Sequence, residues 1–177
     1  MADHGEKAFE DQFHENWERV NSLLFRLVGD PAEADDLALE VFWRLHQTPP
    51  REREDSQIRA WLYRVATNLG YNHLRSRRRR QHYESLGGSL DLNSRESVDP
   101  AHEALRREEH ARVQGVFREL KRGQAQIIAL RYSGLSYAEI AAALQISPSS
   151  VGQLLARAEA EFEKQYRKLE ETDGPSE

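Results

Sequence analysis

Apolar side chains recur at intervals of three and four residues along most of this chain of 177 residues. The first such run consists of Phe9, Phe13, Trp17, Val20, Leu24 and Leu27. This spacing places them on one face of an α-helix, because the helix repeats about every 3.6 residues. Comparable patterns predict helices over 7–28, 31–46, from 56 into a cluster of arginines, 101–119, 137–144, and from 148 onward. We therefore expect an all-α protein.

The helical pattern is interrupted between positions 85 and 99, where turn-forming residues surround a Gly-Gly pair. Such a stretch is typical of a flexible linker. We expect two small helical domains, over 7–83 and 101–169, joined by a flexible linker over 84–100. The last residues, 170–177, are expected to form a disordered tail.

Two pairs of residues predict where helices begin. Asp30 and Glu33 have the spacing of a capping box, and Pro31 suits the first helical turn between them. Ser136 and Glu139 repeat the same spacing ahead of a short helix.

A helix-turn-helix is predicted in the C-terminal domain. The short helix over 137–144 is followed by a tight turn at 145–146, and Ser147 then caps a second helix. The second helix of such a motif enters the major groove of DNA by its N-terminus. The side chains that could reach phosphates or base edges there are those of Ser147, Ser149, Ser150, Gln153 and Arg157.

Positive charge is concentrated in one segment of an acidic chain. The net charge is −5, yet residues 51–83 hold nine arginines against three acidic side chains. This asymmetry indicates one localised site for a polyanion. The helix over this segment combines rings, amides and guanidiniums on one stripe, which suits unpaired bases and their phosphates. The stripe comprises Trp61, Arg64, Asn68, Asn72 and Arg75, with Tyr71 at its edge and the basic residues Arg77 and Arg78 following it. Trp61 taken alone suits a core position equally well.

The predicted helix over 31–46 is apolar on two sides. One face consists of Ala34, Leu37, Ala38, Val41 and Leu45. The other consists of Leu39, Phe42 and Trp43, flanked by Asp35, Asp36 and Glu40. A helix of this kind is either central in a core or docks a partner, and the acidic flank favours a docking surface for a protein.

Several classes of protein are excluded by composition and motifs. The chain lacks cysteine, which excludes disulfide scaffolds and thiol catalysis. Its beginning does not resemble a secretory signal, and no apolar run approaches the roughly 18 residues of a membrane span. We therefore expect a cytoplasmic protein with no membrane partner. No P-loop, HExxH, GxSxG or dinucleotide-binding motif is present, so neither catalysis nor a cofactor or metal is expected.

These segments together resemble the extracytoplasmic-function (ECF) sigma factors, the smallest class of the sigma-70 family of bacterial transcription initiation factors. The resemblance covers about residues 10–80 and 105–165 and rests on three motifs. "GDPAEADDLALEVFWRLHQ" at 29–47 resembles the region 2 helix that docks on the clamp helices of the RNA polymerase beta-prime subunit. "IRAWLYRVATNLGYNHLRSRRRR" at 58–80 resembles the helix that melts and reads the minus-10 element. "LSYAEIAAALQISPSSVGQLLARA" at 135–158 resembles the minus-35-reading helix-turn-helix of region 4.

The resemblance implies roles for particular residues and partners. Polymerase docking would fall on Asp36, Leu37, Leu39, Glu40, Phe42 and Trp43. The stripe from Trp61 to Arg78 would hold the minus-10 element, with the loop over 48–57 capturing a flipped base. The recognition helix would read the minus-35 element. The partners implied are core RNA polymerase, through its beta-prime clamp helices and beta flap, promoter DNA and an anti-sigma factor, and the free protein would be a monomer.

The sequence departs from the family pattern at several of these positions. Leu39 stands where the family commonly has Gln, which bears on polymerase docking. Gly152, Leu154 and Glu159 stand where Lys and Arg are usual, so the minus-35 contact is expected to be weak or of unusual sequence.

Three other functions are weighed against a sigma factor. A conventional helix-turn-helix regulator would bind a palindrome as a dimer. It would have no use for the stripe that suits single-stranded DNA. An enzyme is disfavoured by the missing motifs, and a polymerase-binding decoy without initiation activity would fit the weakly charged recognition helix.

Overall fold

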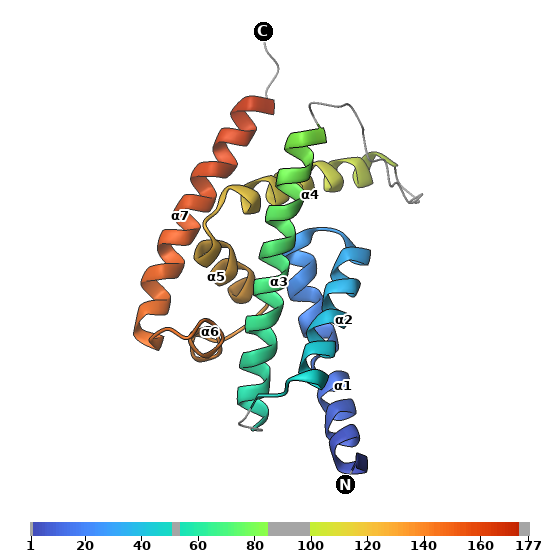
Figure 1. Ribbon diagram of the computed structural model, residues 1–177. Helices are drawn as coiled ribbons and strands as arrows, with labels where there is room; N and C mark the ends of the chain where they lie inside the picture. The colour runs from blue at the N-terminus through green and yellow to red at the C-terminus, as the bar shows by residue number, and fades with distance from the viewer. Residues whose placement is uncertain (1, 51–53, 85–99, 174–177) are drawn as a thin grey trace.

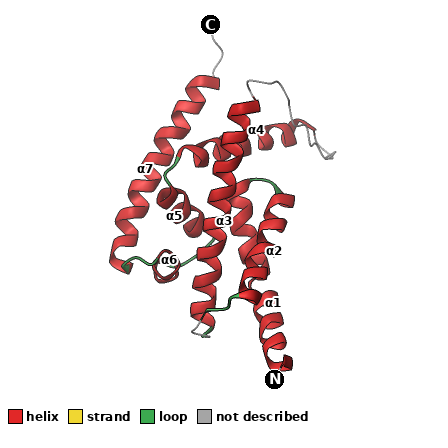
Figure 2. Ribbon diagram, viewed as in Figure 1, coloured by secondary structure: helices red, strands yellow, loops and turns green. Residues whose placement is uncertain are grey.

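The computed structural model describes residues 2–50, 54–84 and 100–173, which form helices and no strand (Figures 1 and 2). The helices are α1 (Ala2–Val28), α2 (Pro31–Gln47), α3 (Asp55–Glu84), α4 (Pro100–Glu119), α5 (Arg122–Tyr132), α6 (Tyr137–Leu144) and α7 (Pro148–Asp173). The all-α expectation is confirmed. The segment expected to be the linker lies almost wholly outside the described residues.

Helix α3 occupies the centre of the arrangement (Figure 1). Helices α1 and α2 pack against it from the N-terminal half, and α4, α5 and α6 contact it from the C-terminal half. Helix α7 packs on α4, α5 and α6. The two halves of the sequence therefore share one continuous apolar core, which runs from Val20 and Leu24 in α1 to Val151 and Leu155 in α7.

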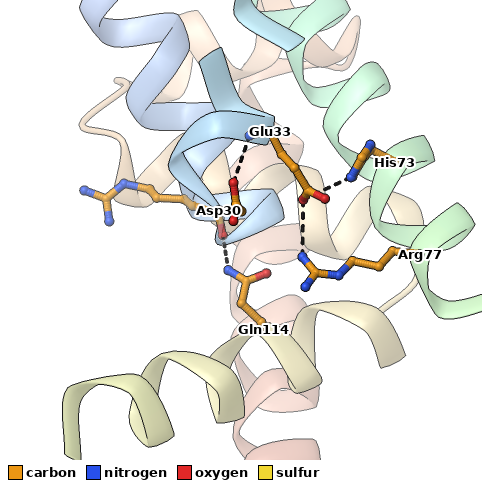
Figure 3. Close-up of polar contacts among 6 residues, drawn as sticks. Asp30, Glu33, His73, Arg77 and Gln114 are labelled. Carbon is orange, nitrogen blue, oxygen red and sulfur yellow. Dashed lines mark hydrogen bonds and ion pairs between the residues drawn. The ribbon is translucent and has the colours of Figure 1, made fainter. Parts of the chain in front are cut away.

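The junction between α1 and α2 is fixed by two local interactions. Asp30 accepts a hydrogen bond from the Glu33 backbone N–H at 2.9 Å, as the capping pattern predicts. Gly29 ends α1 with a φ of +79°, and a Cβ atom there would lie 2.7 Å from the side chain of Gln114 in α4. The Gln114 amide donates to the carbonyl oxygen of Arg26 at 2.9 Å (Figure 3). The end of α1 is thus joined directly to α4.

The Glu33 side chain does not complete the predicted capping box. Its carboxylate points instead to α3, where it lies 3.1 Å from His73 Nε2 and 3.2 Å from an Arg77 guanidinium nitrogen (Figure 3). The spacing alone could not show this, because the α3 partners lie some forty residues further along the chain.

The short helix α6 has both halves of the predicted box. The Ser136 hydroxyl oxygen accepts from the Glu139 backbone N–H at 3.3 Å, and the Glu139 carboxylate accepts from the Ser136 backbone N–H at 2.9 Å. The Ser136 hydroxyl also donates to this carboxylate at 2.7 Å. The helix ends at Gln145, which adopts the left-handed conformation with a φ of +57°. This residue makes the tight turn that the sequence predicts between the two helices of the motif.

Substituting Glu139 with Gln should destabilise the protein at pH 7 but much less at about pH 3. The two hydrogen bonds from Ser136, first that of the backbone N–H and then that of the hydroxyl, hold the pKa of Glu139 below its ordinary 4.5. A carboxyl whose pKa is lowered on folding stabilises the protein above its unfolded-state pKa, and this contribution disappears as the pH falls through the folded-state pKa. Thermal melting of the wild type and Glu139→Gln at both pH values measures the effect. An equal difference between their midpoints at the two pH values would contradict it.

Several predicted boundaries differ from the structure. Helix α1 begins at Ala2 rather than near 7, and α7 continues to Asp173, so the first residues of the expected tail are helical. The good helix formers Glu170 and Glu171 extend α7 past Leu169, its last core contact. The start of α1 contains the poor helix formers Asp3, His4 and Gly5, and composition does not explain its extension. Helix α5 is not predicted as a separate element, because its buried residues run continuously from Ala125 to Leu130 without a helical stripe.

Candidate functional site

Helix α2 presents an exposed apolar surface with acidic neighbours. Leu39 and Trp43 are 54% and 59% exposed, and Asp36 and Glu40 lie beside them. We call these four residues the α2 surface. They border a hollow of about 450 Å³ between α1 and α2, which is also lined by Phe9 and Phe13 of α1 and by Phe42 and His46 of α2. Large apolar side chains exposed together are typical of a protein-binding site.

Phe42 does not belong to the exposed part of this surface, so its assignment to the second apolar face of the helix is wrong. Its side chain is 1% exposed and packs between Phe13 and Trp17, with ring centroids 4.9 and 5.9 Å away. It forms the floor under the hollow. Leu37 is likewise half-buried against the core. Leu37 and Phe42 therefore pack beneath the α2 surface, whereas Leu39 and Trp43 are its exposed apolar residues.

The stripe on α3 is divided by the packing of the C-terminal half. Asn72 and Arg75 are exposed, and Trp61 is half-buried against the core. Tyr71, expected at the edge of the solvent-facing stripe, is 5% exposed, and its hydroxyl donates to the Leu120 carbonyl oxygen at 3.3 Å. The stripe is therefore not a continuous solvent-facing strip, because α3 is covered on more sides than its apolar pattern predicts.

Two polar residues of the stripe are bonded to the C-terminal half. Two Arg64 guanidinium nitrogens donate to the carbonyl oxygens of Ala143 and Ala142, each at 3.0 Å. The Asn68 side-chain oxygen accepts from Arg122 and, at 2.8 Å, from Gln126. No signal in the sequence identifies these contacts, since they join residues that are 54 to 79 positions apart.

The basic end of α3 is partly neutralised. Arg77 pairs with Glu33 of α2, and His73 lies against the same carboxylate (Figure 3). The side chain of Arg78, and residues 51–53 of the predicted base-capturing loop over 48–57, lie outside the described residues.

Helices α6 and α7 form the helix-turn-helix. Ile140 and Val151 are fully buried and join the two helices, as expected from the pattern. The predicted DNA-facing residues Ser147, Ser149, Gln153 and Arg157 are exposed, and Ser150 is half-buried. The hydroxyls of Ser147 and Ser149 lie 2.7 Å apart at the start of α7. The recognition face is thus open to solvent while part of the α3 stripe is not.

Within the described ranges, no group of three or more His, Asp or Glu side chains is placed to hold a metal ion. No helix in those ranges is long and apolar enough to span a membrane.

The protein combines three features: a helix-turn-helix with an open recognition face, a basic helix, and a separate exposed apolar surface. This combination is typical of a transcription factor that binds DNA and a protein partner. The family model of Sigma-70 region 2 matches residues 13–80, and that of Sigma-70, region 4, matches residues 110–162. The chain belongs to the sigma-70 family, as an ECF-type member.

Curated relatives agree with this assignment. The chain is 32% identical over 160 residues to the RNA polymerase sigma-H factor of Pseudomonas aeruginosa, covering 85% of this chain and 82% of the relative. It is 26% identical to the ECF RNA polymerase sigma factor SigW of Bacillus subtilis, over 92% of this chain and 90% of that protein. It is 28% identical to the ECF RNA polymerase sigma-E factor of Escherichia coli, over 85% and 82% respectively.

The protein is therefore an RNA polymerase sigma factor. It binds the polymerase core and promoter DNA and acts in promoter-specific transcription initiation. Members of this family are initiation factors and not catalysts.

Proposed function

We propose that the α2 surface is the primary contact with polymerase and that it docks on the clamp helices of the beta-prime subunit. The observation that carries this proposal is the pair of large apolar side chains, Leu39 and Trp43, each more than half exposed. Asp36 and Glu40 beside them supply negative charge that a basic partner surface would complement. Leu39, at a position where the family commonly has Gln, adds apolar area to this contact.

The second part of the proposal assigns α3 and the 48–57 loop to the minus-10 element. Asn72 and Arg75 are already exposed, and Trp61, Arg64 and Asn68 lie on the same helix next to them. An aromatic ring can stack on an unpaired base, amides can bond its edge, and guanidiniums can neutralise phosphates. Holding an unstacked base offsets a cost of a few kcal/mol for removing it from the duplex.

The third part assigns the start of α7 to the minus-35 element. Its DNA-facing side chains are mostly uncharged, so the motif should bind weakly on its own. Region 4 would still act on promoters, because the contacts with polymerase and with the minus-10 element already hold the protein in place. This raises the effective concentration of the second contact. The beta flap of polymerase would provide a further contact. The segments over 7–83 and 101–169 act in this proposal as two domains.

Three wider proposals accompany these contacts. The protein acts in the bacterial cytoplasm, where polymerase and DNA are found. It is a monomer when free. An anti-sigma factor that covers the α2 surface or the recognition helix would regulate it.

The test of the proposed function is transcription by core polymerase on fragmented genomic DNA, with and without this protein, followed by sequencing of the 5′ ends. We expect new start sites that share minus-10 and minus-35 motifs upstream. Stable co-elution with core polymerase without new starts would identify a decoy instead. Tight, specific promoter binding by the protein alone would contradict the dependence on polymerase.

Replacing Arg157 with Ala should reduce initiation about ten-fold on promoters that need the minus-35 element, because an arginine contact to a base or phosphate contributes about 1–3 kcal/mol. The matched control is Lys164→Ala, which removes an exposed positive charge further along α7 that pairs with Glu161 at 3.7 Å. Transcription from one promoter with its minus-35 element intact or scrambled measures the effect. The role of Arg157 is refuted if its variant and the control lose activity equally on both templates.

A further inference from the structure

We propose that this protein binds a small aromatic acid in a cavity between α1, α4, α5 and α7. The cavity has a volume of about 750 Å³, and pockets that hold small molecules typically measure about 300–1,000 Å³. None of the residues that line it belongs to the α2 surface, the stripe on α3 or the DNA-facing residues of the recognition helix. The inference therefore goes beyond the proposed function and does not depend on it.

Aromatic rings from all four helices line the cavity. Phe25 of α1 stacks on His110 of α4, with ring centroids 5.4 Å apart and an angle of 16° between the ring planes. Phe117 of α4 meets Phe162 of α7 edge to face, with centroids 5.8 Å apart. Tyr132 adds a fifth ring from the end of α5. Rings held in this way offer faces and edges on which a further aromatic ring can pack, so the lining favours an aromatic ligand.

The cavity is open to molecules in solution. Phe25 and Tyr132 are 38% and 60% exposed, whereas Phe117, Ile128 and Ala129 are buried. The lining therefore runs from an exposed rim to a buried floor. An aromatic ring that moves from water onto this floor buries apolar surface and gains dispersion contacts with side chains that face unfilled space.

The charged side chains at the cavity favour an acid over a base. Arg26 of α1 lines the cavity, is exposed, and forms no ion pair with a carboxylate among the described residues. Glu159 of α7 lines it as well, and it is likewise exposed and unpaired within the described part of the chain. An anionic group is attracted to Arg26 and repelled by Glu159, so it should lie on the α1 side of the cavity.

The rings and the charges together determine how the ligand lies. Burying a charged group without a partner costs free energy, so the acidic group should stay at the exposed rim. There the Arg26 guanidinium can donate two hydrogen bonds to a carboxylate or a sulfonate. The aromatic part then points inward, toward the buried ring of Phe117.

Two fluorescent probes with the same rings test the chemistry of the site. Anilinonaphthalene sulfonate carries an acidic group, and phenylnaphthylamine is its uncharged counterpart. Titration of the full chain should show one saturable site for each probe. Arg26→Gln should weaken binding of the sulfonate about five- to ten-fold and change binding of the uncharged probe by less than about two-fold. Glu159→Gln should strengthen binding of the sulfonate about two-fold, because it removes a repulsive charge.

The matched control is Arg19→Gln. Arg19 is exposed on the same face of α1, about two turns before Arg26, and does not line the cavity. Its substitution should leave both affinities unchanged. Equal losses of the two probes in Arg26→Gln, or the same sulfonate affinity in Arg26→Gln and Arg19→Gln, would overturn the choice of an acid.

Filling the cavity tests its location. Ser22 is an exposed lining residue of α1, so Ser22→Trp should place a ring in the cavity and weaken binding of both probes at least about ten-fold. Glu15→Trp is the control, because it places the same ring on the same face of α1 about two turns earlier, outside the lining. Circular dichroism of both variants checks that the helices are intact. Folded Ser22→Trp that binds the probes as tightly as Glu15→Trp would overturn the site.

Methyl NMR of the unsubstituted protein locates the probe without any variant. Bound anilinonaphthalene sulfonate should shift the methyl resonances of Val113 and Ile128, which line the cavity. The methyl resonances of Val41, buried in α2 away from the lining, should not move. Shifts at Val41 without shifts at Val113 and Ile128 would place the probe elsewhere and overturn the site, as would the absence of saturable binding. Neither result bears on transcription, so failure of this inference leaves the proposed function untouched.

Discussion

Replacing Trp43 with Ala is expected to weaken binding to core polymerase about 30-fold or more and to abolish initiation at limiting protein concentration. A buried interface tryptophan typically contributes at least about 2 kcal/mol to binding, which corresponds to this factor. Trp43 is 59% exposed in the free protein, and among the described residues its ring stacks on that of His46, with ring centroids 6.0 Å apart. It is therefore available to enter a pocket on the partner. Fluorescence anisotropy of labelled protein titrated with core polymerase measures the effect.

The matched control for this experiment is Tyr132→Ala. Tyr132 is 60% exposed, so it has nearly the same accessibility as Trp43, but it lies at the end of α5. Its removal should change the affinity for polymerase by less than about three-fold. Equal losses for the two variants would show that loss of an exposed aromatic ring, and not docking through α2, causes the effect. An unchanged affinity of Trp43→Ala would reject the α2 surface as the primary contact.

Replacing the adjacent Phe42 with Ala should have the opposite profile. The ring is 1% exposed and packs on Phe13 and Trp17, so truncation leaves a cavity in the core. The expected loss is about 3–5 kcal/mol in the free energy of unfolding. Urea denaturation followed by circular dichroism measures it, and Phe42→Leu should recover much of the stability because most of the volume is kept.

The two neighbours on α2 are thus expected to separate stability from binding. Trp43→Ala should change the free energy of unfolding by less than about 0.5 kcal/mol, since it removes an exposed side chain. A loss below about 1 kcal/mol for Phe42→Ala would show that this part of the core collapses around the missing ring. Such a small loss would also show that the Phe42 ring contributes less to the packing beneath the hollow than its burial indicates.

The local features of this protein could be predicted from its sequence because their causes are local. Asp30 and Ser136 cap helices through groups three residues away, and the turn at Gln145 lies between two apolar patterns. The helical periods of α2, α6 and α7 are likewise set by residues within each helix. For such elements the spacing of a few residues determines the structure.

The candidate site could be predicted less completely, because its geometry depends on contacts between distant segments. Nothing near Arg64 or Asn68 indicates that α5 and α6 provide their partners. Glu33 has the spacing of a capping residue but pairs with α3. On the helical wheel Phe42 belongs with Leu39 and Trp43, and only the packing of α1 over it places it in the core. Periodicity shows which faces are apolar, but not how many neighbours a helix has.

The contact between Gly29 and Gln114 limits which substitutions these two positions can accept during evolution. A side chain at position 29 would collide with Gln114 and would also have to adopt an unfavourable φ of +79°. A change at 29 therefore requires the Gln114 side chain to move or to be replaced by a smaller one. It also requires a residue that accepts this backbone conformation, of which asparagine is the best candidate. The two positions, far apart along the chain, should change together wherever this contact between the end of α1 and α4 is retained.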